Sequence, residues 1–224
     1  MDRTLSFLHT SAVHVPTFRA LLASLGPEIP ARHVVDESLL SDVRAAGRVT
    51  AELKERITGT LLALEELGAT VVVCTCSTIG GAVEEMNGTM SAILLRVDRP
   101  MAQEAVARGS RIVVASTLAS TLVPTRELIA SAARQAQKPV EIIDLLCTKA
   151  WRYFEQGRLQ AYLQEIAYQV QEAATLGDVI VLAQASMTNA SEFYGDLPVP
   201  VLSSPRSGLQ AAIQAYRGKY PTII

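Results

Sequence analysis

Short apolar runs rich in valine, isoleucine and leucine alternate along the chain with longer segments of helical periodicity. Such alternation is typical of parallel β-strands that are buried on both faces and joined by helices. The pattern therefore predicts an α/β fold. Eight runs are predicted as strands, at residues 4–9, 33–36, the run that begins at 69, 91–97, 111–117, 139–146, 178–184 and 199–203.

The segments between the strands carry apolar residues at helical spacing. Leucine and isoleucine recur every three or four positions over 53–64, which predicts one apolar helix face. Glycines are expected to interrupt these helices, because glycine adopts left-handed backbone conformations at little cost. Gly47 is predicted to divide the helical region 38–67, and Gly157 to kink the region 150–176.

The strands fall into two sets of four. This arrangement predicts two pseudo-symmetric Rossmann-like domains, each with a four-stranded parallel sheet, and an active site in the inter-domain cleft. A turn at 98–100 precedes the second set, and a terminal helix at 207–216 is expected to return to the first domain. We therefore assign residues 1–98 plus 205–224 to the first domain and 99–204 to the second.

Composition narrows the class of protein. Hydrophobic residues make up 49% of the 224 residues, which indicates a compact globular protein. The 20 Lys and Arg residues nearly balance the 22 Asp and Glu residues, and the absence of a basic block argues against nucleic-acid binding. No apolar run reaches about 18 residues and no export signal is evident, so we expect a cytoplasmic protein that is not bound to a membrane. Three cysteines, an odd number, favour free thiols over a disulfide framework.

Polar side chains cluster where the predicted strands end. In a parallel sheet these ends share one edge, which is where α/β proteins usually bind their ligands. Small hydroxyls and helix amino termini there offer hydrogen-bond donors to a small carboxylate. Some of them, Thr10, Ser11 and Ser186, are equally well explained as helix caps. The clusters are His9, Thr10 and Ser11; Cys76, Ser77 and Thr78; Thr117 and Thr121; and Gln184, Ala185 and Ser186.

Cys76 is the residue best suited to chemistry. It follows the strand that begins at 69 and precedes a helix predicted over 79–86, and the N–H groups and dipole of a helix amino terminus favour a thiolate. Cys76 could then act as a base or nucleophile, although a core position is the alternative. Cys74 is expected to be a core residue, and so is Cys147, with a position at the edge of the sheet left open for Cys147.

Neither a metal nor a nucleotide cofactor is predicted. His9, His14 and His33 lack metal-ligand spacing with the cysteines. The pair Gly80-Gly81 matches neither a P-loop nor a dinucleotide fingerprint. Three arginines that could bind anions are expected instead to be solvated at the surface: Arg96, Arg99 and Arg206.

Three stretches resemble the aspartate/glutamate/hydantoin racemase superfamily. Residues 72–78 are similar to the first catalytic stretch of that family, in which a strand ends in Cys-Asn-Thr or Cys-Ser-Thr. Residues 112–121 look like the strand that opens the second domain, whose threonines line the substrate pocket. Residues 178–187 are similar to the second catalytic stretch, where hydantoin-type members have Gly-Cys-Ala-Gly-Met. The resemblance covers most of the chain and implies the same two-domain fold.

The resemblance also implies a reaction. Members of this family use two cysteines on opposite faces of the substrate's α-carbon, but here Gln184 stands at the position of the second cysteine. An amide does not exchange a proton at useful pH, so the resemblance implies a cofactor-independent, single-cysteine isomerase acting on a small carboxylate, amino acid or hydantoin. Cys76 would be the catalytic thiolate, and the substrate-binding residues would be Ser11, Ser77, Thr78, Thr117, Thr121, Gln184, Ala185 and Ser186.

Several alternatives stay open. The superfamily includes single-cysteine decarboxylases and cis-trans isomerases, so a lyase is the second reading of the reaction. A non-catalytic protein that binds small carboxylates is another reading. A third keeps two-base chemistry by using Cys147 or His9 as the second acid/base group. In each case the expected partner is a small molecule, and a homo-oligomer is compatible with the sequence.

Overall fold

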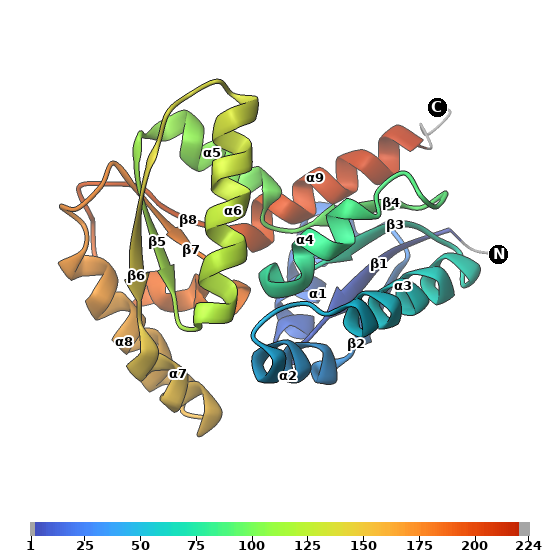
Figure 1. The fold of residues 1–224 in the computed structure, drawn as a ribbon, viewed down its shortest axis with the longest axis horizontal. Helices are drawn as coiled ribbons and strands as arrows, with labels where there is room; N and C mark the ends of the chain where they lie inside the picture. The colour runs from blue at the N-terminus through green and yellow to red at the C-terminus, as the bar shows by residue number, and fades with distance from the viewer. Residues whose placement is uncertain (1–2, 220–224) are drawn as a thin grey trace. The chain divides into compact units, whose positions relative to one another are not determined.

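A computed structural model describes residues 3–219 of the chain (Figure 1). Within this range it contains eight strands, all in parallel pairs, which confirms the predicted α/β class. The strands are β1 Thr4–His9, β2 Ala31–Val35, β3 Ala69–Cys74, β4 Ile93–Arg96, β5 Arg111–Ser116, β6 Glu141–Leu146, β7 Val179–Leu182 and β8 Val201–Ser203. The helices are α1 His14–Leu25, α2 Glu37–Ala46, α3 Ala51–Glu66, α4 Ser77–Glu85, α5 Arg99–Arg108, α6 Ala119–Gln135, α7 Thr148–Glu155, α8 Leu159–Glu172 and α9 Ser204–Lys219, with a 3₁₀ helix, η1, at Ala185–Glu192.

The strands form two four-stranded sheets of the same topology. The first has the order β2-β1-β3-β4 and the second β6-β5-β7-β8. In each sheet the first strand along the chain lies beside the third, and the strand order reverses between these two central strands. Ligands of open α/β sheets bind outside the carboxyl ends of the strands at such a reversal. The topology therefore singles out the ends of β1 and β3 in one sheet and of β5 and β7 in the other.

The chain divides into two compact units, each built around one sheet. The first comprises residues 3–97 and 205–219, and the second Asp98–Ser204. The chain thus crosses between the units twice, after β4 and before α9. None of the helices within 3–219 is both long and apolar enough to cross a bilayer.

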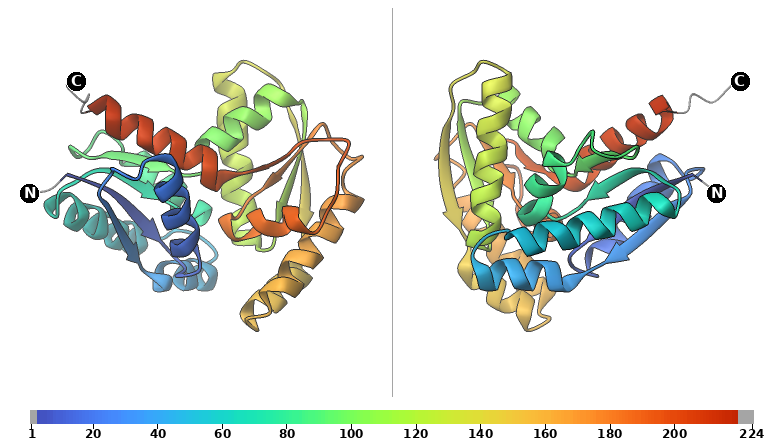
Figure 2. Two further views of the ribbon diagram at one scale, coloured as in Figure 1. Left: turned by 180° about the vertical axis from the view of Figure 1, so that it is seen from behind. Right: turned by 45° about the vertical axis from the view of Figure 1, so that its right-hand side comes forward.

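In the first unit, helices cover both faces of the sheet. α2, α3 and α4 pack on the face that carries Leu8, Val72 and Cys74 (Figure 1). α1 lies on the opposite face, where the ring of Phe18 contacts Phe7, and α9 lies on that side as well (Figure 2). Apart from the half-buried Thr70, both central strands are therefore buried along their length, so a ligand can approach them at their ends.

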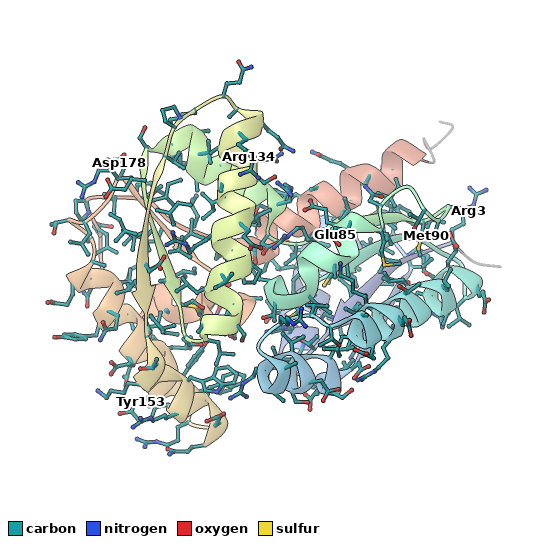
Figure 3. The ribbon with its side chains drawn as sticks, viewed as in Figure 1. Arg3, Glu85, Met90, Arg134, Tyr153 and Asp178 are labelled. Atoms are coloured by element: carbon teal, nitrogen blue, oxygen red, sulfur yellow. The ribbon has the colours of Figure 1, made fainter. Side chains whose placement is uncertain are left out.

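In the second unit, alternation along β5 sends side chains to two separate cores. Ile112 and Val114 pack against α5 and α6, whereas Val113 and Ala115 pack against α8 and η1. At the amino ends of the strands, the carboxylate of Asp178 (Figure 3) accepts hydrogen bonds of 2.8 Å from the backbone N–H groups at 110 and 111. Because these contacts fix β7 beside β5, the residues that follow the two strands also lie side by side.

The bounds of several elements differ from the predicted ones; β2 is Ala31–Val35 instead of 33–36, and α9 begins at Ser204 instead of 207. α4 begins at Ser77 instead of 79, because Cys76 is extended and takes the N-cap position. The helical region 150–176 is two helices, α7 and α8, because Gly157 adopts a left-handed φ of 69° between them. β7 ends at Leu182, before the predicted end of the strand at 184, and the 3₁₀ helix η1 follows it. Gly47, with a φ of 72°, separates α2 from α3 as predicted.

Candidate active site

Cys76 lies at the carboxyl end of β3, where the strand is tied to both of its neighbours. The backbone N–H of Thr75 donates to the carbonyl of Leu8 at 3.0 Å, and the carbonyl of Cys74 accepts from the N–H of Val97 at 2.9 Å. Cys76 then leaves the sheet with φ −107° and ψ 114° as the N-cap of α4, and only 7% of it is exposed. The thiol is thus held beside the first turn of a helix, where backbone N–H groups lack intrahelical partners.

Cys74 is a core residue. It has no exposed surface and packs against α2, α3 and α4. Its Sγ donates to the carbonyl of Cys76 at 3.5 Å. Of the two cysteines, Cys76 is therefore the one placed beyond the strand.

The glycine pair in α4 accommodates a buried arginine. The side chain of Arg96, at the end of β4, is 4% exposed and lies 3.8 Å from the carboxylate of Glu84. A Cβ added at Gly80 would come within 3.2 Å of its Nε, whereas one added at Gly81 would be no closer than 3.8 Å. The expectation that Arg96 is solvated at the surface is therefore wrong. The sequence offered no signal for its burial, because the space is created by a glycine on another element.

His9 and Cys147 are poorly suited to be a second acid/base group. Burial, together with the charges of His33 and His14, lowers the pKa of His9 to about 3, and both ring nitrogens of His9 are hydrogen-bonded. Burial, together with the carboxylate of Glu165, raises the pKa of Cys147 to about 12, so this cysteine is a neutral thiol. Near pH 7 the first is a neutral imidazole whose two ring nitrogens are both engaged within the protein, and the second is a neutral thiol that is no base.

In the second unit, Gln184 is tied to the end of β5. Its Oε1 accepts hydrogen bonds of 2.7 Å from both the backbone N–H and the hydroxyl of Thr117, and a longer one of 3.4 Å from the Ser116 hydroxyl. A backbone N–H can only donate, so these contacts determine which end of the amide faces Thr117. The Nε2 group of Gln184 is the part of the amide that these contacts leave as a hydrogen-bond donor.

The other predicted residues of the second unit take part in the hydrogen bonding and packing of the fold. The hydroxyl of Ser186 shares a 2.7 Å hydrogen bond with the phenol of Tyr162. Burial raises the pKa of Tyr162. Ala185 begins η1, and Thr121 is buried in α6. Among the residues predicted here, the side chains of Thr117 and Gln184 are joined directly by a hydrogen bond.

The predicted residues of the first unit lie around the ends of β1 and β3. Ser77 and Thr78 form the first turn of α4 and are buried, and Ser11 is half-buried in the turn before α1. Two residues missed at the sequence level are Thr75 and His33, which bond to His9. Both belong to stretches that read as ordinary strand or strand end, so nothing in their spacing marks them.

A metal centre finds no support in the described part of the chain. No group of three or more His, Cys, Asp or Glu side chains between residues 3 and 219 is arranged to hold an ion.

No protein-family model and no curated protein matches the sequence.

Solved racemase structures share the fold of the chain. An aspartate racemase from Picrophilus torridus has a TM-score of 0.70 at 16% identity, covering 96% of this chain and 98% of its own. A glutamate racemase from Francisella tularensis, in complex with D-glutamate, has a TM-score of 0.69 at 13% identity, covering 98% and 83%. An allantoin racemase from Klebsiella pneumoniae has a TM-score of 0.66 at 16% identity, covering 97% and 89%. At these identities the similarity establishes the two-unit α/β fold.

Proposed function

We propose that the protein is a cofactor-independent isomerase of the racemase type that acts at the α-carbon of a small carboxylate, amino acid or hydantoin. The observation that carries this proposal is the position of Cys76, at the carboxyl end of a central strand and the amino end of α4. The fold is shared with aspartate, glutamate and allantoin racemases, which supports the choice of substrate class.

In this proposal Cys76 moves the proton. Its thiolate removes the α-proton, and the electron pair left on carbon is delocalised into the neighbouring carbonyl or carboxylate group. Ser11 and the hydroxyls of Ser77 and Thr78, with the N–H groups of the first turn of α4, bind the oxygens on which charge develops. Backbone donors at that turn carry no competing base, so they stabilise the enolate without quenching it.

Gln184 supplies a hydrogen bond to the same substrate in place of a second thiol. Its Oε1 is occupied by Thr117, so the group left for the substrate is Nε2–H, a donor suited to a carboxylate oxygen. Thr117 orients this donor, and Thr121, Ala185 and Ser186 are the other substrate-binding residues that we propose in this unit. The phenol of Tyr162 is hydrogen-bonded to the hydroxyl of Ser186.

The presence of Gln184 in place of a second thiol favours a lyase as the second candidate. With one thiol, a proton returns to the face from which it was taken, and racemisation needs another donor on the opposite face. In the isomerase proposal that donor is water, and the hydroxide it leaves takes the proton held by the Cys76 thiol. Decarboxylation needs only one proton transfer: the bond to the departing carboxylate breaks, CO₂ leaves, and the carbanion takes its proton from the Cys76 thiol. Water then reprotonates the thiolate.

Deuterium incorporation from D₂O into a panel of amino acids, hydantoins and substituted malonates tests the proposal. We expect the wild-type protein to exchange the α-proton of at least one compound, or to label the product of a decarboxylation. Cys76→Ala should lower that rate by about 10²- to 10⁴-fold, the usual contribution of a general acid–base group. Cys74→Ala is the matched control and should keep the rate, because Cys74 lies in the core. Equal rates in wild type and Cys76→Ala would contradict the assignment.

The binding-protein alternative gives a different result. Small carboxylates would then raise the melting temperature without any deuterium entering the ligand. Iodoacetamide labelling of Cys76 against pH adds a second readout, since only the thiolate reacts. Ligand-induced stabilisation with no exchange across the whole panel would replace the proposed enzyme with a binding protein.

A further inference from the structure

A chain of hydrogen bonds runs through the first unit to the residue beside Cys76. The hydroxyl of Thr75 donates to the carbonyl of Leu8 at 3.2 Å and lies 2.9 Å from Nδ1 of His9. Nε2 of His9 lies 2.9 Å from Nδ1 of His33. The chain therefore connects three parallel strands, β3, β1 and β2, near their carboxyl ends.

The donors and acceptors along this chain follow from the chemistry of each group. The Thr75 hydroxyl has one proton, which goes to the carbonyl of Leu8, so it accepts from Nδ1–H of His9. A neutral His9 then carries no proton on Nε2, which must accept from Nδ1–H of His33. One tautomer of each ring satisfies every contact, and each ring fixes the tautomer of the next.

The ring of His9 is enclosed by other rings of the first unit. The ring has no exposed surface and stacks on His33 with 5.2 Å between centroids. The ring centroids of Phe18 and His14, both of α1, lie 5.7 Å and 6.4 Å from that of His9. The backbone carbonyl of His9 accepts from the N–H of Asp36 at 2.9 Å.

The titratable neighbours also disfavour a charge on His9. Burial, then the charges of His33 and His14, lowers the pKa of His9, and burial alone lowers that of His14 to about 4. Burial and the charge of Arg19 lower the pKa of His33. A proton taken up by His33 can sit on its Nε2 and leave the bond to His9 intact. A second proton, on His9, would place two N–H groups face to face, so the chain persists through neutral and mildly acidic pH.

We propose that His9 is a positioning residue that acts through Thr75 to hold the β3–α4 turn, and with it Cys76, in one place. The inference rests on the proposed function of Cys76. Thr75 precedes Cys76 by one peptide bond, and its hydroxyl is held by two partners on β1. The backbone N–H of Thr75 still donates to Leu8 when either hydroxyl contact is lost, so the loss loosens, without releasing, the turn in which the chain passes from strand to helix. Small displacements of a reacting group from its productive geometry cost large factors in rate.

Substitutions of His9 and Thr75 test the proposal through turnover. Thr75→Val and His9→Leu should each lower kcat for deuterium exchange by about 10- to 100-fold with little change in KM, since neither residue binds substrate. The double variant should be no slower than the slower single variant, because both changes break the same contact. Thr75→Ser keeps the hydroxyl and should therefore retain most of the wild-type rate. Thr70→Val, at the amino end of the same strand, is the matched control and should leave it unchanged.

Two readouts separate this inference from the function on which it rests. The rate of Cys76 alkylation by iodoacetamide in Thr75→Val, relative to wild type, reports the position of the thiol even when no compound in the panel is turned over. Long-range ¹H–¹⁵N correlation spectra of the wild-type protein at pH 7 report the tautomer of His9 without any substitution. We expect altered alkylation in Thr75→Val and the Nδ1–H form of His9. Unchanged alkylation and kcat in folded variants, or an Nε2–H form of His9, would overturn the proposal, whereas absence of exchange in wild type alone would overturn only the proposed function.

Discussion

The orientation of one amide determines what the second unit can offer a substrate. Gln184 follows β7 as Cys76 follows β3, at the topologically equivalent position of the other sheet. Two donors from Thr117 hold its Oε1, which leaves the NH₂ group available. A group that can only donate a hydrogen bond binds and polarises a carboxylate but does not relay a proton. The two units are therefore chemically unequal although their folds are alike.

Two substitutions of Gln184 separate its structural contacts from its proposed contact with substrate. Gln184→Glu keeps an oxygen for Thr117 but replaces the NH₂ donor with negative charge, so we expect KM for a carboxylate substrate to rise at least about 10-fold with little change in stability. Gln184→Leu leaves the N–H of Thr117 without its partner and should lower the free energy of unfolding by about 1–3 kcal/mol, measured by urea denaturation. An unchanged KM in Gln184→Glu would rule out the substrate contact.

At the scale of elements, α4 depends on the first of its two adjacent glycines and not on the second. Gly80 lies against the buried side chain of Arg96, so the helix and the end of β4 approach closely at this point. Gly81, the next residue, has room for a side chain. The close approach matters for the site because α4 begins at Cys76, and a shift of the helix away from β4 would carry the thiol with it.

The glycine pair provides its own matched comparison. Gly81→Ala should raise the free energy of unfolding by about 0.5–1 kcal/mol, since alanine favours a helix over glycine and its Cβ would meet only an ordinary contact at 3.8 Å. Gly80→Ala gains the same propensity but forces Arg96 to move, so it should be less stable than Gly81→Ala by about 1 kcal/mol or more. Urea denaturation of the two variants measures the difference. Equal stabilities would show that Arg96 moves without cost.

At the scale of the whole molecule, the chain leaves the first unit after β4 and returns to it with α9. The return is a close backbone contact, because a Cβ added at Gly208 would lie 2.1 Å from the carbonyl oxygen of Val97. Val97 is the last residue of the unit before the crossing, so departure and return meet at one point. Further contacts along α9 include the hydroxyl of Tyr216, which donates to the carbonyl of Arg3 at 3.2 Å.

Gly208→Ala should therefore destabilise the protein. The added methyl group has no space without a shift of α9, and overpacking of this kind costs about 1–3 kcal/mol or more. We expect a lower melting temperature by calorimetry or fluorescence. Gly218→Ala, in the same helix with nothing within 4 Å, is the control and should leave the melting temperature unchanged or slightly raised. Similar melting temperatures in both variants would contradict the close docking of α9.

The sequence by itself determined most of the elements of this protein and the place of Cys76 between a buried strand and a helix. Hydrophobic periodicity and glycine positions act over a few residues, so the strands and the break at Gly47 followed from local pattern. Cys76 followed for the same reason, because a thiol after a buried apolar run and before a helix is a local arrangement. The exact residues at which each element begins and ends did not follow from local pattern, as the start of α4 at Ser77 shows.

Only the tertiary structure decided how polar groups pair. Thr117 and Gln184 are 67 residues apart, and His9 and Thr75 are 66 apart, so no spacing in the sequence connects them. Arg96 is buried because Gly80, on another element, leaves room for it. Hydrogen bonds and close packing act over a few ångströms in space, and the fold alone determines which distant residues come within that range.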